Sequence, residues 1–155
     1  MGFGVSGATA VVVVGLFVSA GLFYDAASTS YEAVGDAEAA RAEALLEQRN
    51  TAIGVADAGV QPPGNAPLVV TVNNTGSTGV SVPETTLLAD NVVVPHDSNA
   101  TWAVEGDSTT DVWLPGETLE VSVSRTWLDD TFGTGVDPAR VKVATDTGVS
   151  DTGVV

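Results

Sequence analysis

The first charged side chain in this sequence is Asp25, and the stretch before it, Phe3–Tyr24, is apolar or small throughout. A helix over this stretch would be roughly 33 Å long, which is enough to cross the hydrocarbon core of a bilayer. We therefore expect a transmembrane anchor over residues 1–24. A cleaved secretory signal is disfavoured, because such signals have a basic segment before a shorter apolar region.

The rest of the chain is acidic. Its 20 Asp and Glu outnumber its 5 Lys and Arg, and the formal net charge is -15. This charge repels phosphates, so we expect no nucleic acid partner. A hydrophobic content of 44% argues against an acidic disordered chain. Excess carboxylate without Cys indicates a halophilic protein, because concentrated salt shortens the Debye length to about 3 Å at 1 M and screens the repulsion.

Beyond the anchor, the sequence predicts two further parts and a tail. Residues 25–50 are rich in Ala and Glu without Pro, which predicts an acidic helical stalk that stops at Asn50. From residue 51 the pattern changes to about seven short alternating strands, most clearly Leu68–Asn73 and Thr118–Arg125, with no helix between them. This pattern predicts an all-β, immunoglobulin-like antiparallel β-sandwich over residues 51–145. The tail, residues 146–155, repeats DTGV and is expected to be flexible.

The alternation within the strands also predicts which side chains form the core. The expected inward-facing residues are Ile53, Val55, Val70, Val72, Leu88, Val93, Trp102, Leu119, Val121, Val123, Val141 and Val143.

No constellation typical of an active site is present. His96 is the only histidine and lies in a turn, and the chain has no Gly-x-Ser-x-Gly elbow and no phosphate-binding glycine loop. Zinc would need more His or Cys, and no D-x-D-x-D-G loop orders the carboxylates for calcium. We therefore predict a non-enzymatic chain with no catalytic residue, cofactor or metal. Carboxylates considered as calcium ligands, but expected to be solvated, are Asp107, Asp111, Asp129, Asp130 and Asp137.

Two features predict surface roles for the sandwich. Asn73 and Asn99 begin N-x-Thr sequons and are candidate N-glycosylation sites in an exported domain. Trp127, Leu128 and Phe132 form an aromatic and apolar segment before the last predicted strand. This segment is either an exposed surface that binds a partner or a buried plug beneath a loop.

The order of segments resembles the haloarchaeal form of the archaellum (archaeal flagellum) accessory protein F family, with the sister protein G second. The matching segments are MGFGVSGATAVVVVGLF, EQRNTAI, LVVTVNNTGS, TTLLADN, the turn Trp113–Glu117, TLEVSVS and RVKVAT. Together they span Met1 to about Thr145.

This resemblance implies a stator-like protein. One helix would sit in the cytoplasmic membrane, and the sandwich would lie in the pseudoperiplasmic space beneath the S-layer. There it would bind the S-layer glycoprotein together with protein G and hold the motor while the filament turns. Other motor or filament components and a homodimer are further expected contacts.

Two alternatives stay open. Type IV pilins and archaellins also have an apolar N-terminal helix and a β head, and the chain could be such a filament subunit. Pilins need a basic leader that ends in Gly before the apolar run, whereas only Met1 precedes Gly2 here. A generic S-layer-associated binding module is the other alternative.

Overall fold

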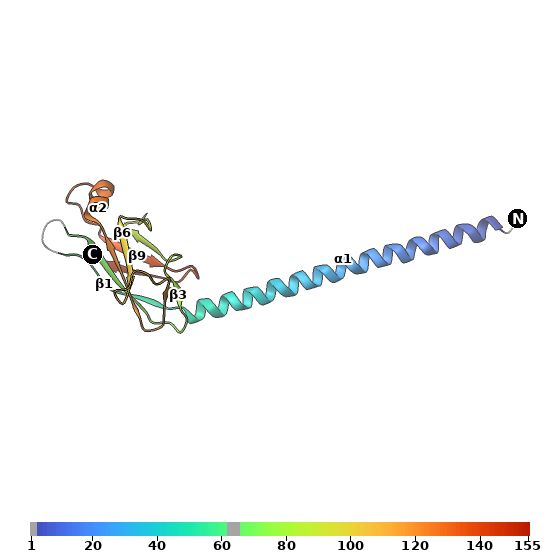
Figure 1. The fold of residues 1–155 in the computed structure, drawn as a ribbon. Coiled ribbons are helices and arrows are strands. Elements are labelled where there is room, and N and C mark those ends of the chain that lie inside the picture. The colour runs from blue at the N-terminus through green and yellow to red at the C-terminus, as the bar shows by residue number, and fades with distance from the viewer. Residues whose placement is uncertain (1–2, 62–65) are drawn as a thin grey trace. The chain divides into compact units, whose positions relative to one another are not determined.

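The computed structural model describes residues 3–61 and 66–155 and divides the chain into two compact units, Met1–Glu43 and Ala44–Val155. The first unit is most of helix α1, which runs from Phe3 to Asn50 (Figure 1). Residues 7–24 are exposed on every side of this helix, with Phe17 and Phe23 about three-quarters accessible. By length and composition alone, α1 is suited to cross a membrane. A helical segment that is apolar or small on every side, as residues 7–24 are, is stable in an apolar environment rather than in water.

The second unit is an antiparallel β-sandwich. One sheet has the strand order β1-β2-β8-β6, the other has the order β10-β9-β4-β5, and a small third sheet pairs β3 with β7. The predicted architecture, an apolar N-terminal helix followed by an antiparallel β-sandwich, is confirmed. The strands are β1 (Ile53–Val60), β2 (Leu68–Asn74), β3 (Val80–Ser81), β4 (Thr86–Ala89), β5 (Val92–Val93), β6 (Ala100–Val104), β7 (Val112–Trp113), β8 (Thr118–Val123), β9 (Arg140–Ala144) and β10 (Ser150–Val154).

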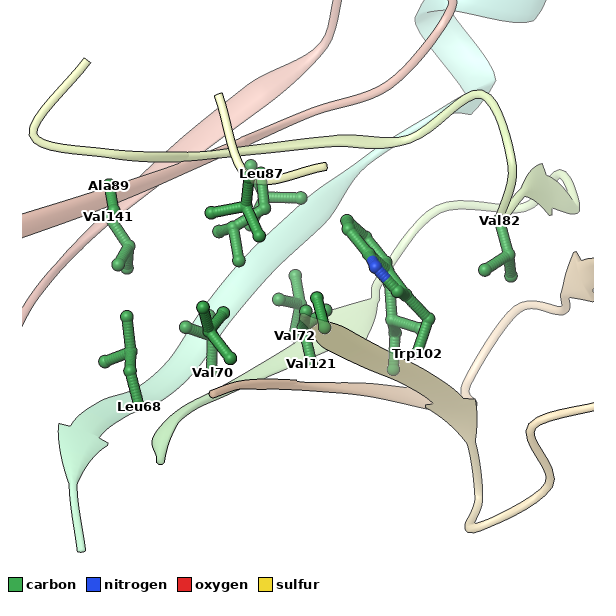
Figure 2. Packing of buried hydrophobic residues seen from close by; sticks show 14 of the residues in the cluster. Leu68, Val70, Val72, Val82, Leu87, Ala89, Trp102, Val121 and Val141 are labelled. Atoms are coloured by element: carbon green, nitrogen blue, oxygen red, sulfur yellow. The ribbon is translucent and has the colours of Figure 1, made fainter. Parts of the chain in front are cut away.

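The core lies between the two four-stranded sheets. Alternate residues of β2 are fully buried, as the period of two along a strand requires. Figure 2 shows these side chains pointing toward those of the facing sheet. Trp113 is also fully buried, whereas Ile53 and Val55 are only partly buried against the core. Buried residues labelled in the figure are Leu68, Val70, Val72, Val82, Leu87, Ala89, Trp102, Val121 and Val141.

The predicted core is wrong at Leu88 and Val93. Leu87 and Ala89 are buried instead, and Val93 is 57% exposed while Val94 is buried. The segment Thr86–Val94 has doubled apolar residues, so its sequence fits either phase of a strand. The two-residue turn Asp90-Asn91, with φ of 44° and 69°, pairs Leu88 with Val93 and fixes both on the outer face.

Two further elements were not expected from the sequence. Helix α2 (Arg125–Phe132) follows β8 in a region where no helix was predicted. Residues 150–154 of the tail, which was expected to be flexible, form β10 in full register with β9. The Val55 N–H donates to Asp151 Oδ2 at 2.8 Å and so joins β10 to β1 of the other sheet. A Cβ on Gly153 would lie 2.6 Å from Val55 Cγ1, so β10 approaches β1 too closely for any side chain there.

Gly153→Ala is expected to lower the free energy of unfolding by about 1–3 kcal/mol, because the added methyl group must displace the stiff Val55 side chain. Gly59→Ala on β1 is the matched control, since nothing lies within 4 Å of its Cβ position. That variant should change stability by less than about 1 kcal/mol. Urea unfolding at fixed salt measures both. Equal stability of the two variants would contradict the close packing of β10 on β1.

Candidate functional site

His96 is used in packing. Its Nε2 lies 2.7 Å from the Thr85 carbonyl oxygen, which only accepts hydrogen bonds, so Nε2 carries the proton and donates it. The ring stacks on Trp102, with centroids 3.9 Å apart and planes at 15°. The indole Nε1 of Trp102 is buried and has no acceptor among the residues that the structure describes. Nε2 of His96 is therefore not placed to act as a base toward a nucleophile.

Many carboxylates accept hydrogen bonds from backbone N–H groups instead of only facing water. Asp107, for example, accepts from both the N–H and the hydroxyl of Thr109, which lowers the pKa of Asp107. Within residues 3–61 and 66–155, no three His, Asp or Glu side chains lie together as metal ligands would. The other carboxylates that accept from the backbone of another residue include Asp90, Asp97, Glu105, Glu117, Asp129 and Asp151.

The aromatic segment proposed as a partner surface is largely part of the core. Leu128 lies on the inner side of α2 and is fully buried, so it cannot contact a partner. Trp127 and Phe132 meet edge to face at 6.0 Å, and both are half-buried against the core. Ser124 caps the helix by accepting from the Trp127 N–H at 3.3 Å. The geometry thus favours the buried plug, the second of the two alternatives drawn from the sequence.

Arg125 joins α2 to the loop that follows it. Its Nε donates to Asp129 Oδ1 at 2.8 Å, and its Nη1 donates to Asp137. Asp129 also accepts from the Gly135 N–H at 3.1 Å. The Gly135 hydrogen bond, followed by the contact with Arg125, lowers the pKa of Asp129 despite its partial burial. The carboxylates of Asp137 and, after it, Asp129 raise the pKa of Arg125.

The two sequons lie in different surroundings. Asn73 is on β2 between β1 and β8, and its Oδ1 accepts from the Thr118 hydroxyl at 3.1 Å. Asn99 lies in the turn before β6, where its backbone N–H and its Nδ2 both donate to Asp97. A turn is more accessible to a modifying enzyme than a central strand. Glycosylation at either residue remains a proposal, and Asn99 is the better acceptor of the two.

The end of α1 is attached to the sandwich by residues 74–78, which we call the helix-end turn. The Ser77 N–H donates to the Asn50 carbonyl at 2.8 Å, and the Thr75 and Gly76 N–H groups donate to the Ala52 carbonyl at 2.9 Å each. A Cβ on Gly76 would lie 2.5 Å from the Asn50 carbonyl oxygen. Only glycine allows so close an approach of the two backbones.

Side chains complete this attachment within the unit Ala44–Val155. Asn74 is 1% exposed, and its Nδ2 donates to the Thr78 and Trp113 carbonyls at 2.9 and 3.0 Å. Gln48 on the last turns of α1 donates to the Thr147 carbonyl at 3.0 Å. Sequence reasoning identified the stop at Asn50 and the tight turn NTGSTG separately. Nothing in the sequence indicated that the two meet.

Leu128→Ala should lower the free energy of unfolding by about 2–5 kcal/mol, because it leaves a cavity in the core. Thr126→Ala, at an exposed position of the same helix, is the control and should have little effect. Thermal unfolding of both variants measures this. A Leu128→Ala protein as stable as the control would mean that Leu128 is free to contact a partner after all.

Asp129 predicts a pH dependence of stability. The pKa of Asp129 is lower in the folded state than its ordinary value of 3.8. Ionised Asp129 therefore stabilises the folded protein fully above pH 3.8, and this stabilisation is lost as the pH falls through the pKa of the folded state. Asp129→Asn should therefore destabilise the protein at neutral pH and flatten the acid side of its stability curve. Asp130→Asn, an exposed neighbour, is the control. Trp fluorescence during acid titration measures both, and identical curves would contradict the prediction.

Comparison with known proteins gives no family model and no curated protein that matches the chain. Among solved structures, the chain is similar to the archaellum periplasmic stator protein FlaG from Sulfolobus acidocaldarius, with 15% identity, a TM-score of 0.44, and coverage of 68% of this chain and 99% of that one. It is also similar to a chain of the archaellum periplasmic stator protein complex FlaF and FlaG from the same organism, with 14% identity, a TM-score of 0.42, and coverage of 66% and 87%. These neighbours are archaellum stator proteins, the kind that the sequence resembles. Their identities and TM-scores are low, so the function is argued from this chain itself.

Proposed function

We propose that this chain is a non-enzymatic, membrane-anchored component of the archaellum motor, a stator-like element that binds the S-layer and holds the motor during filament rotation. The observation that carries the proposal is the helix-end turn. A stator must resist torque between its membrane foot and its binding head. Here the Asn50 and Ala52 carbonyls, at the point where the acidic end of α1 enters the β-sandwich, are held by backbone hydrogen bonds that a flexible linker would lack.

The sequence supports the partners and the location. The resemblance to the haloarchaeal accessory protein F covers the anchor, the NTGS turn and the strands in order. It implies an α1 in the cytoplasmic membrane and a sandwich beneath the S-layer, with the S-layer glycoprotein and protein G as partners.

One observation favours a second function. α1 is a single helix of 48 residues that leads directly into a β head, an architecture that type IV pilins share. In a filament, the apolar surface of α1 would be buried by neighbouring subunits rather than by lipid. The two functions differ in where the chain is found: in the membrane for a stator, and in sheared filaments for a subunit.

The proposal is tested in a haloarchaeon that encodes this chain. Deleting the chain should abolish swimming while filaments still assemble, and the wild-type gene should restore swimming. The tagged full-length chain, solubilised in molar KCl, should retain purified S-layer glycoprotein. Normal swimming of the deletion strain would refute a stator role. Recovery of filament subunits in place of the S-layer glycoprotein would favour the pilin-like alternative.

Gly76→Ala tests the mechanical role of the helix-end turn in the same strain. The added methyl group must push the turn away from the Asn50 and Ala52 backbones, so swimming should weaken while the S-layer glycoprotein is still retained. Gly59→Ala, which has open space around its Cβ position, should swim like the wild type. Equal swimming of the two variants at equal protein levels would show that the attachment is not needed for function.

A further inference from the structure

We propose that the outer face of the sheet β10-β9-β4-β5 is the docking surface for an acidic protein. We call this surface the basic face. This inference rests on the proposed function only for the identity of the acidic partner, which would be the S-layer glycoprotein. Its members are Leu88, Val93, Arg140, Lys142, Thr152 and Val154.

Charge is the first argument. Of the five basic residues, two lie on α1, and Arg125 is held by Asp129 and Asp137. The remaining two, Arg140 and Lys142, are two positions apart on β9 and therefore point to the same side. Both are exposed, and neither forms a salt bridge with any residue that the structure describes. In a chain of net charge -15, the two unpaired cations of the sandwich thus lie together.

The register places apolar side chains around these cations. Leu88 pairs with both Val93 and Lys142, Lys142 pairs with Thr152, and Arg140 pairs with Val154. Val93 is 57% exposed and Val154 is 79% exposed. Both β4 and β5 contain two apolar residues in a row, so either residue of each pair could face the core. Leu88 and Val93 are the ones that face outward.

A hollow of about 260 Å³ lies between the two cations, lined also by Leu88, Asp90 and Thr152. The one carboxylate there, Asp90, is directed to the chain itself. Its two oxygens accept from the Ala139 and Arg140 N–H groups at 2.9 and 3.1 Å. It therefore fixes the β9 backbone, and the long side chains of Arg140 and Lys142 stay available to an incoming carboxylate.

An acidic protein fits this surface better than a bilayer or a second copy. Each Lys or Arg contributes only about 1 kcal/mol to binding an anionic membrane, and the remaining charge of the chain opposes such binding. A two-fold dimer centred on this face would bring the two cations of one copy against the two cations of the other. A carboxylate-bearing protein pairs with both cations and covers the exposed valines, and Arg beside apolar area is typical of the centre of an interface.

The test uses the full-length chain in detergent, at the lowest KCl concentration that preserves its near-UV Trp spectrum. The variant is Arg140→Glu/Lys142→Glu. The matched control is Arg41→Glu/Arg49→Glu, which replaces two cations with two anions on α1 and so changes the net charge equally. The probes are purified S-layer glycoprotein and poly-L-glutamate. The first variant should bind both probes about tenfold more weakly or worse, whereas the control should stay within about twofold of the wild type.

Other results would overturn the proposal. Equal losses in both variants would mean that net charge alone matters, and unchanged binding would place the partner on another face. Capture of anionic vesicles through Arg140 and Lys142 would identify a membrane surface. Sedimentation that shows self-association lost only in Arg140→Glu/Lys142→Glu would identify a second copy.

The same data separate this inference from the proposed function. Retention of the S-layer glycoprotein that is unaffected by Arg140→Glu/Lys142→Glu refutes the basic face but leaves the stator role intact. Binding of poly-L-glutamate through the basic face, without any retention of the S-layer glycoprotein, refutes that partner but supports the face. The contribution of the apolar side chains to binding is tested with Val93→Ser, which should bind a few-fold more weakly than the wild type. Val112→Ser, at a similarly exposed position on β7, is the control and should bind like the wild type.

Discussion

The attachment of α1 to the sandwich depends on the hydrogen bonds of one buried side chain, the amide of Asn74. Its Nδ2 donates to two carbonyls, its Oδ1 accepts from the Gly76 N–H, and its backbone pairs with residues 116 and 117. One residue thus joins the end of β2, the start of β3, and the turn after β7. Without the Asn74 side chain, the Thr78 and Trp113 carbonyls would lose this donor, and a buried carbonyl left unsatisfied costs about 1–3 kcal/mol. Because Gly76 is fixed by this amide, the carbonyls that end α1 also have fixed partners.

The sequence predicted most of this fold wherever a strand alternates strictly. β8 alternates over its whole length, so its inward residues Leu119, Val121 and Val123 were predicted correctly. In β2, Val70 and Val72 were predicted but the buried Leu68 was missed, because residues 68–70 are all apolar and show no alternation. Leu88 and Val93 were predicted wrongly, because TLLADNVVV fits either phase and only the turn at residues 90–91 decides between them. β10 was missed because Ser150–Val154 lacks large side chains, and its place depends on Gly153 fitting against Val55. Long-range fits of this kind leave no periodic signal in a single sequence.

The many carboxylate side chains do more than keep the surface solvated in salt, because several of them also accept hydrogen bonds from the backbone. Asp90, Asp107 and Asp151 each accept backbone N–H groups, two of them across more than 40 residues of sequence. Such charge-assisted hydrogen bonds hold loops that have few apolar contacts of their own. Composition alone predicts only a solvated acidic surface, because it does not say which carboxylates face a backbone amide. It also does not reveal that the two unpaired cations of the sandwich are neighbours.

Attachment and binding are connected through the two strands nearest the chain end. β9 carries both cations of the basic face, and the turn that joins it to β10 contains Thr147, whose carbonyl accepts from Gln48 on α1. β10 in turn meets β1 through Asp151 and Val55, and only two residues separate the end of α1 from the start of β1. A force applied by a partner at Arg140 and Lys142 therefore reaches the helix end through short hydrogen-bonded paths. This continuity is what a static element needs, and it makes β10 essential to the proposed role.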